Sequence, residues 1–156
     1  MTPVRTDPVT SAVGEAASAA GYRRHRNTWH CENEETVLLI NVQKSQHGQQ
    51  FFVNLGVIVK ALGERSSPSA SNSHLQWRLE EFMPDAQRDD LAAALDLERS
   101  LDGARRSAVL RSALATYGLP RLEDMSTMDR LRSELKRDPQ VRAHAMAKLK
   151  RFMAMP

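Results

Sequence analysis

The sequence predicts an α+β fold in which an antiparallel sheet of about four strands packs against N-terminal and C-terminal helices. Apolar residues recur at helical spacing before residue 21, alternate with polar residues in several stretches between residues 27 and 82, and return to helical spacing after Pro84. A chain of 156 residues fits one domain. We therefore predict a single domain over residues 1–156, with a C-terminal helical part at 85–156.

The first element is predicted as a helix that begins at Asp7 and Pro8 and ends before Gly21. Asp is a favoured N-cap, Pro fits the first helical turn, and Gly is favoured just past a helix end. Small apolar residues lie on one stripe of this helix: Val9, Ala12, Val13, Ala16, Ala17 and Ala20. Such a stripe predicts close packing on a sheet.

The strongest strand pattern is a pair of stretches at residues 36–44 and 51–61, rich in β-branched and aromatic residues. The short link between them predicts an antiparallel hairpin. If Lys44 lies opposite Phe51, six aliphatic residues fall together on one face, the interior one, namely Leu38, Ile40, Val42, Val53, Leu55 and Val57. The same register pairs Asn41 with Asn54 and Gln43 with Phe52 on the other face, and a slip of one residue would mix the two sets.

Two flanking stretches also alternate and are predicted as strands. In residues 27–32, Thr28 and His30 fall on one side, and Trp29 and Cys31 on the other. In residues 74–82, the apolar side holds Leu75, Trp77 and Leu79, and the polar side holds His74, Gln76, Arg78 and Glu80. Residues 63–73, which are rich in Ser, Gly and Pro, are predicted as a flexible loop.

Helices are predicted after Pro84. The first covers residues 91–101, and the second covers residues 103–117 and ends at Gly118 and Pro120. A capping box formed by Ser126 to Asp129 precedes a third helix. A continuous last helix begins at Asp138-Pro139 and carries Val141, Ala145, Leu149 and Phe152 on its apolar side.

The net charge of +3 is made of opposed blocks. Residues 80–98 hold seven acids and one base, which gives −6, and residues 129–151 hold eight bases and three acids, which gives +5. Blocks of opposite sign can neutralise each other within the fold or across a homodimer. The predicted location is the cytoplasm, without membrane contact, since no signal peptide or long apolar run is visible.

No metal site and no cofactor are predicted. The five histidines are scattered, no metal-ligand spacing appears, and His25 and His30 are expected on opposite faces of a strand. Cys31 is predicted as a buried core thiol because His30, its neighbour, would project from the opposite face and could not act as its base.

The feature that suggests a function is the polar side of the predicted sheet. Asn41, Gln43 and Asn54 interrupt two otherwise apolar strands on that side, and His30, Gln76 and Arg78 can share it. Amide groups with an Arg guanidinium form a surface that suits recognition of a protein loop or a polar ligand. Two other interpretations remain open: a solvated polar sheet face, or a buried amide network that fixes the fold.

Several motifs resemble a known family. Gly21-Tyr22-Arg23-Arg24 leads to Asn27-Thr28-Trp29, then Ile40-Asn41-Val42-Gln43-Lys44-Ser45, Phe52-Val53-Asn54-Leu55-Gly56-Val57, His74 with Arg78, and Gly118-Leu119-Pro120 followed by Leu122. Over residues 21–135 the chain resembles the bacterial family catalogued as domain of unknown function 4304. The resemblance implies an α+β fold and no established activity. The chain has Arg88-Asp89-Asp90-Leu91 where the family's tryptophan-rich stretch is expected, and the last helix is an expected addition.

Three functions are considered. The first is a non-enzymatic protein-binding module, in its concrete form a bacterial immunity protein that neutralises a toxin partner through the face of Asn41, Gln43, Asn54 and Arg78. The second is nucleic-acid binding through a basic C-terminal set consisting of Arg137, Arg142, Lys148, Lys150 and Arg151. The third is an unrecognised enzyme that uses His74 and Arg78.

Overall fold

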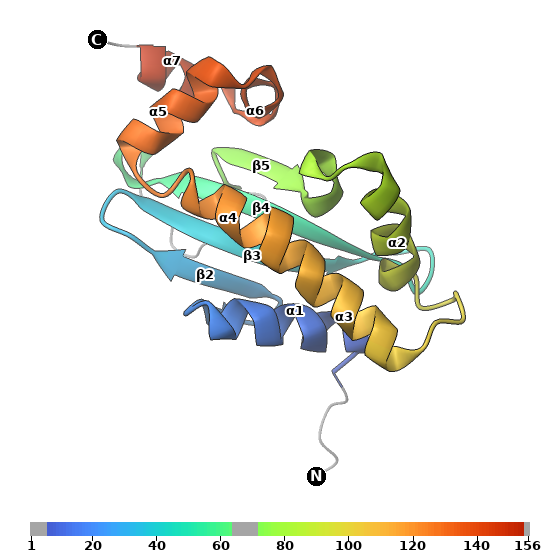
Figure 1. Cartoon of the computed structure of the whole chain (residues 1–156). Coiled ribbons are helices and arrows are strands. Elements are labelled where there is room, and N and C mark those ends of the chain that lie inside the picture. Colours follow the sequence, from blue (N-terminus) through green and yellow to red (C-terminus); the bar gives the residue numbers. More distant parts are fainter. Residues whose placement is uncertain (1–5, 64–71, 155–156) are drawn as a thin grey trace.

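The computed structural model describes residues 6–63 and 72–154. It confirms the α+β class. Five strands form one antiparallel sheet in chain order (Figure 1): β1 Arg23–His25, β2 Thr28–Glu32, β3 Thr36–Lys44, β4 Phe51–Val59 and β5 Leu75–Arg78. The predicted loop at 63–73 lies largely outside the described residues.

The predicted register of the central hairpin is confirmed. Lys44 lies opposite Phe51, and the pairs Asn41–Asn54 and Gln43–Phe52 follow as expected. The aliphatic set of β3 and β4 is buried on one face of the sheet, the inner face. The alternation of β2 is confirmed as well, since Trp29 pairs with Ile40 and is fully buried.

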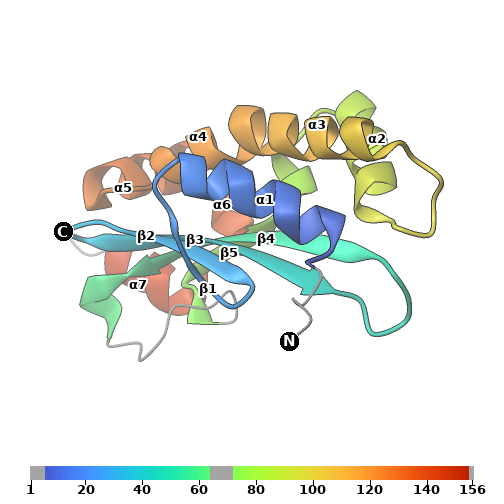
Figure 2. The same cartoon turned by 90° about the horizontal axis from the view of Figure 1, so that it is seen from below.

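Four helices cover the inner face (Figure 2): α1 Pro8–Ala19, α2 Asp85–Leu95, α3 Gly103–Ala113 and α4 Leu119–Glu123. The start of α1 is as predicted, because the Asp7 carboxylate accepts hydrogen bonds from the Thr10 backbone N–H at 2.8 Å and from its hydroxyl at 2.7 Å. Gly14 lets α1 approach the sheet, since a Cβ there would lie 2.9 Å from the Trp29 ring. Close contact between α1 and Trp29 therefore depends on the absence of a side chain.

Three more helices form the C-terminal extension, defined as residues 125–154: α5 Met128–Arg137, α6 Pro139–His144 and α7 Ala147–Ala154. Figure 1 shows the extension at one end of the sheet, beside β5 and away from α2. Two short 3-10 turns, Lys60–Leu62 and Leu79–Phe82, follow β4 and β5.

Several predicted helix bounds were wrong. The helix predicted at 91–101 begins at Asp85 and ends at Leu95, and Asp96 bridges to Gln50. The second helix does not end at Gly118. It passes through a π turn, Leu114–Gly118, into α4. Pro120 has no N–H to donate to a carbonyl of the preceding turn, and the wider π turn accommodates the loss of this hydrogen bond.

The remaining corrections concern the extension. The N-cap of α5 is Thr127, whose side chain accepts from the Arg130 N–H at 3.2 Å, so the predicted capping box is absent from this helix start. The last helix is broken at Ala145, which is extended and bridges to Leu75 of β5. The neighbouring Met146 N–H donates to the His74 carbonyl at 2.9 Å. Pairing with the edge of the sheet, rather than helical propensity, therefore determines the backbone conformation at Ala145 and Met146.

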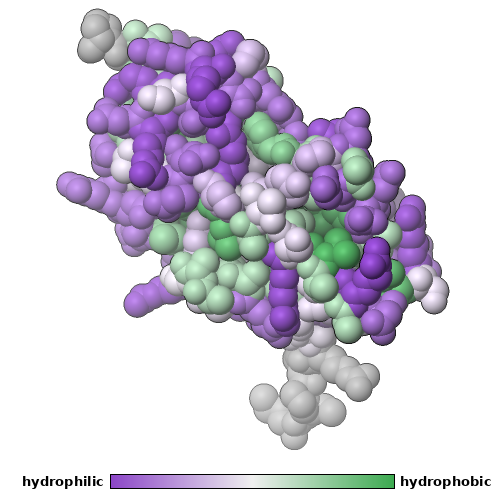
Figure 3. Space-filling view, in the orientation of Figure 1, coloured by the Kyte–Doolittle hydropathy of each residue, from purple (hydrophilic) through white to green (hydrophobic). Residues whose placement is uncertain are grey.

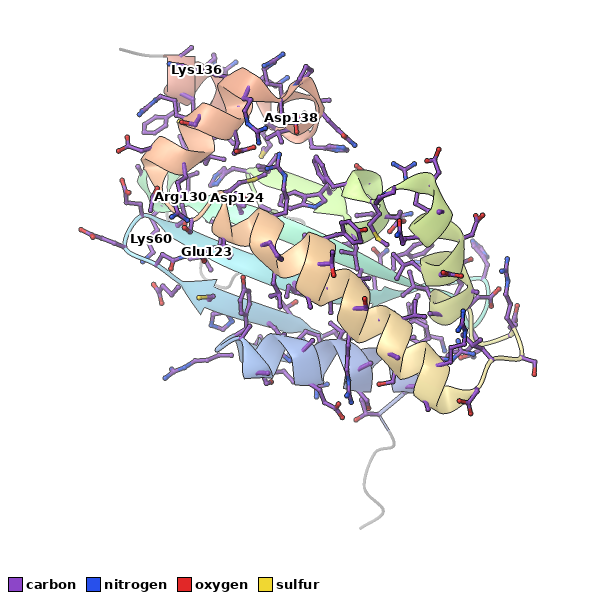
Figure 4. The ribbon with its side chains drawn as sticks, in the orientation of Figure 1. Lys60, Glu123, Asp124, Arg130, Lys136 and Asp138 are labelled. Atoms are coloured by element: carbon purple, nitrogen blue, oxygen red, sulfur yellow. The ribbon has the colours of Figure 1, made fainter. Side chains whose placement is uncertain are left out.

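The extension is joined to the sheet by an ionic and aromatic junction. Arg121 of α4 is 13% exposed, and its guanidinium donates to Glu134 at 2.6 Å and to Asp138 at 2.9 Å. The same guanidinium lies 5.2 Å from the centroid of the Phe82 ring, which packs edge-on against Trp77. Figure 4 shows Asp138 out on the extension, beyond the end of α4.

Arg106 forms a second internal polar cluster. It is 5% exposed and lies in the first turns of α3. Its guanidinium donates to four backbone carbonyls at the end of α2 and just beyond, those of Ala93, Ala94, Asp96 and Arg99, over 2.9 to 3.4 Å. Helix carbonyls at a C-terminus lack partners within the helix, so this side chain caps α2.

Replacement of Gly56 by Ala is expected to lower the free energy of unfolding by about 1–3 kcal/mol. A Cβ at this position would lie 2.4 Å from Ser73 Oγ and 3.1 Å from Leu39 Cδ1, and Leu39 is fully buried. Gly103→Ala is the matched control, because nothing lies within 4 Å of its Cβ position. Thermal unfolding compares the two, and equal midpoints would contradict the prediction.

Candidate protein-interaction face

The face of the sheet that α1 to α4 do not cover carries all six residues of the predicted polar side. Antiparallel pairing aligns them in rows: Thr28, Asn41, Asn54 and Arg78 face one another across β2 to β5, as do His30, Leu39, Gly56 and Gln76 in the next row. Gln43 and Phe52 form a third pair. We call the six residues, with Thr28 and Phe52, the amide face.

The amides of this face form a hydrogen-bonded ladder. Asn54 Nδ2 donates to Asn41 Oδ1 and to Gln43 Oε1, both at 3.1 Å. Asn41 Nδ2 donates in turn to Thr28 Oγ1 at 3.1 Å. Three side-chain amides are therefore held in fixed orientations by one another and by β2.

The ladder leaves one donor group and one acceptor without a partner among the described residues. Both hydrogens of Asn54 Nδ2 are used within the ladder, whereas no donor in residues 6–63 and 72–154 bonds Asn54 Oδ1. Within the same ranges, no acceptor takes the hydrogens of Gln43 Nε2. A free carbonyl oxygen beside a free NH₂ group matches the N–H and C=O of a peptide unit.

Arg78 is fixed beside the ladder. Its guanidinium lies 4.0 Å from the centroid of the Phe52 ring, in cation–π geometry. Arg78 is exposed and Phe52 is half-buried, so the planar face of the guanidinium is held while its edge remains open. A pre-oriented guanidinium suits a carboxylate, which it can bind through two parallel hydrogen bonds.

Sequence analysis missed part of this surface. Arg23 pairs with His30 and His25 pairs with Thr28, so both β1 residues lie on the same face as the ladder. The expectation that His25 and His30 point to opposite faces was therefore wrong. They lie on separate strands of a hairpin whose turn contains Arg26, with φ of 57°. Phe52, in contrast, was predicted on this face as the partner of Gln43, and this pairing is confirmed.

One end of the outer face is apolar. Val37, Leu39 and Ile58 form a small separate core there, with exposures of 8%, 0% and 3%. Ser73 packs over Gly56 beside this cluster, and Figure 2 shows α7 on this side of the sheet, toward the same end. The amide face is thus confined to the half of the sheet near the β3–β4 turn.

Exposure distinguishes between the interpretations of the polar residues. Asn41, Asn54 and His30 are half-buried, whereas Gln43, Gln76 and Arg78 are exposed. The interpretation as a buried amide network is therefore wrong. Two interpretations remain: a solvated polar face and a binding face. The interpretation as a binding face depends on the fixed orientation of the amides in the ladder.

The groups considered for catalysis are not brought together. His74 is fully buried, and its Nδ1 accepts a hydrogen bond from the Val59 N–H at 2.9 Å, whereas Arg78 is exposed on the amide face. Cys31 is half-buried against the core rather than fully buried. Burial and the nearby Glu123 carboxylate raise the pKa of its thiol, which disfavours the thiolate.

Two further features of the described ranges bear on function. In residues 6–63 and 72–154, no group of three or more His, Cys, Asp or Glu side chains is placed to hold a metal ion. Across the same stretches, no helix has the length and apolarity needed to cross a bilayer.

The five residues predicted for nucleic-acid binding all lie on α5 to α7, and two of them, Arg142 and Lys150, line one hollow. Arg137 forms an ion pair with Glu134 at 2.7 Å, and Lys148 donates to the Leu62 carbonyl at 2.7 Å. Arg142 donates to the Leu135 and Lys136 carbonyls, both at 2.8 Å, at the end of α5. Lys150 and Arg151 are exposed on α7. Three of the five thus have partners within the chain.

Comparison with protein families gives one match. Residues 13–124 match the family described as Domain of unknown function (DUF4304). The chain belongs to this family. The matched region begins within α1, includes the whole sheet and α2 to α4, and stops where the C-terminal extension begins. No curated protein and no solved structure matches the chain.

Proposed function

We propose that this member of the DUF4304 family is a non-enzymatic protein-binding module whose amide face binds a protein partner. The observation that carries the proposal is the ladder of Asn41, Asn54 and Gln43, which holds a carbonyl oxygen of Asn54 and an NH₂ group of Gln43 that have no partner within residues 6–63 and 72–154. Groups that are already oriented lose little side-chain entropy on binding, so each contact retains more of its free energy.

The charges of the face indicate what the partner carries. Arg23 and Arg78 flank the ladder on β1 and β5, and both are exposed. The acid that follows on the same side of β2, Glu32, forms an ion pair with Lys60 at 3.0 Å. A partner loop with at least one carboxylate, placed to reach Arg78, and with an exposed peptide unit over the ladder complements this arrangement.

The concrete form of the proposal is a bacterial immunity protein that covers and neutralises a toxin encoded by a neighbouring gene. Neutralisation of a toxin by an immunity protein requires a rigid polar face that binds one partner tightly. The ladder supports that requirement because its orientation does not depend on the partner.

The double variant Gln43→Ala/Arg78→Ala is expected to weaken binding of the neighbouring gene's product by at least about thirtyfold. Both side chains are exposed, so the fold should be unaffected. The control is Gln87→Ala/Arg105→Ala, which removes the same two groups from exposed positions on α2 and α3, the helices that cover the opposite face of the sheet. Isothermal titration calorimetry with the purified partner measures both.

Two outcomes would overturn this proposal. The first is the absence of any complex between the two purified proteins. The second is an equal loss of affinity in the two double variants, which would place the contact elsewhere on the chain.

A further inference from the structure

The C-terminal extension contains a hollow that is separate from the amide face. Its volume is about 300 Å³, and it lies where α5, α6 and α7 meet. It is lined by Arg132, Leu135, Lys136, Arg142, Lys150, Met153 and Ala154. This size is near the lower end of the range for ligand-binding clefts.

The lining combines an apolar floor with a cationic rim. Leu135 and Met153 are almost fully buried and form the floor, together with the exposed Ala154. Methionine is flexible and polarisable, so a floor that contains it can fit apolar groups of different shapes. The aliphatic stems of the lysines extend this apolar wall up to their charged ends.

Two of the four rim cations have no acidic partner. Within residues 6–63 and 72–154, no carboxylate lies within ion-pair distance of Lys136 or Lys150. Arg142 is held by the two carbonyls at the end of α5, and Arg132 makes only a 3.6 Å contact with Asp129, whose side chain is 99% exposed. Figure 4 places Lys136 at the end of α5 away from the sheet.

The surroundings do not neutralise these charges. Residues 129–151 carry +5, and the whole chain carries +3, so the remainder is −2. The acidic block of residues 80–98 contacts the extension mainly through the pair of Glu81 with His144. Figure 3 shows hydrophilic residues covering the extension, while paler and apolar residues gather over the middle of the molecule.

We propose that this hollow binds an acidic amphipathic segment of a protein, with one large apolar side chain on the Leu135 and Met153 floor and carboxylates on Lys136 and Lys150. The apolar floor favours this occupant over a nucleic acid, because a phosphate backbone has no group to place on it. The lining also contains no aromatic ring on which a base could stack. The site lies outside the family-matched region and shares no residue with the amide face.

A labelled synthetic peptide tests the proposal with the full chain. The probe is a twelve-residue peptide in which Leu and Phe at helical spacing are flanked by Asp and Glu, and binding is followed by fluorescence anisotropy. Lys136→Glu/Lys150→Glu is expected to weaken binding by at least about tenfold. Ala154→Trp, which fills the hollow from an exposed position, is expected to have a similar effect.

The control is Lys44→Glu/Arg105→Glu, which changes the net charge by the same amount at exposed positions outside the hollow. It should alter affinity by no more than about threefold, because screening limits the effect of distant charges. If Lys136→Glu/Lys150→Glu fails to fold, Lys136→Gln/Lys150→Gln and Ala154→Trp provide the test.

Three results would overturn the proposal. One is that Lys136→Glu/Lys150→Glu and the control bind the peptide with equal affinity. Another is equally tight binding of a peptide with Glu in place of Leu and Phe, which would show that the floor is not used. The third is tighter binding of a twenty-base-pair DNA duplex through the same lysines, which would assign the surface to nucleic acid.

Discussion

Arg106→Met is expected to lower the free energy of unfolding by about 3–4 kcal/mol. The guanidinium is buried and donates to the carbonyls of Ala93, Ala94, Asp96 and Arg99. Methionine fills much of the same volume but donates no hydrogen bond, so these carbonyls lose their partner in a site that water reaches poorly. Each buried polar group left without a partner costs about 1–3 kcal/mol, and partial hydration at the helix end reduces the sum.

Arg105→Met is the matched control for this variant. Arg105 is the preceding residue, exposed on the surface of α3, and its loss should change stability by less than about 0.5 kcal/mol. Urea unfolding curves give both values. A difference of less than about 1 kcal/mol between the two variants would show that Arg106 does not cap α2 in solution.

Arg121→Ala is expected to lower the free energy of unfolding by about 2–3 kcal/mol. Arg121 joins α4 to Glu134 of α5 and to Asp138, the N-cap of α6, and only 13% of its side chain is exposed. Removal of one partner from a largely buried ion pair leaves the other charge uncompensated. Arg130→Ala removes a comparable but exposed pair with Glu123 at 3.6 Å and should cost less than about 1 kcal/mol.

The Arg121 effect should depend on pH. Burial raises the pKa of Glu134, but hydrogen bonds from Arg121 and Arg137 outweigh it and hold the pKa below the ordinary value of 4.5. A group with a lowered pKa stabilises the fold above its ordinary value, and this contribution is lost as the pH falls through the lowered value. The difference in the free energy of unfolding between wild type and Arg121→Ala should therefore become smaller below pH 4.5. If this difference in the free energy of unfolding were the same in acid and at neutral pH, the ion pair of Arg121 with Glu134 would not be its cause.

The central hairpin could be predicted because a slip of one residue would mix its aliphatic and polar residues on both faces. The short link between the strands favours the pairing in which Asn41 lies opposite Asn54, and this is the pairing observed. The positions of the ladder residues follow from that register alone. The ladder's outward donor and acceptor could not be predicted, because they depend on which amide hydrogens are already bonded.

The elements that were missed are determined by distant contacts. The three residues of β1 are all exposed, so no apolar alternation marks the strand. Gly118 lies inside the helical segment, where a Cβ would lie 3.2 Å from Leu79, so this glycine serves close packing and does not end the helix. Lys148 is paired with a carbonyl 86 residues away. None of these contacts leaves a local signal in the sequence.

The bridge between Leu75 and Ala145 occupies the outer edge of β5 with a segment from the extension. At the opposite edge, β1 is short and rich in charged side chains, which discourages the addition of another strand. A chain shortened to the family-matched region would lose the cover of β5 and expose unpaired backbone groups along it. Copies of such a chain could join edge to edge, and the segment at Ala145 blocks this pairing at Leu75.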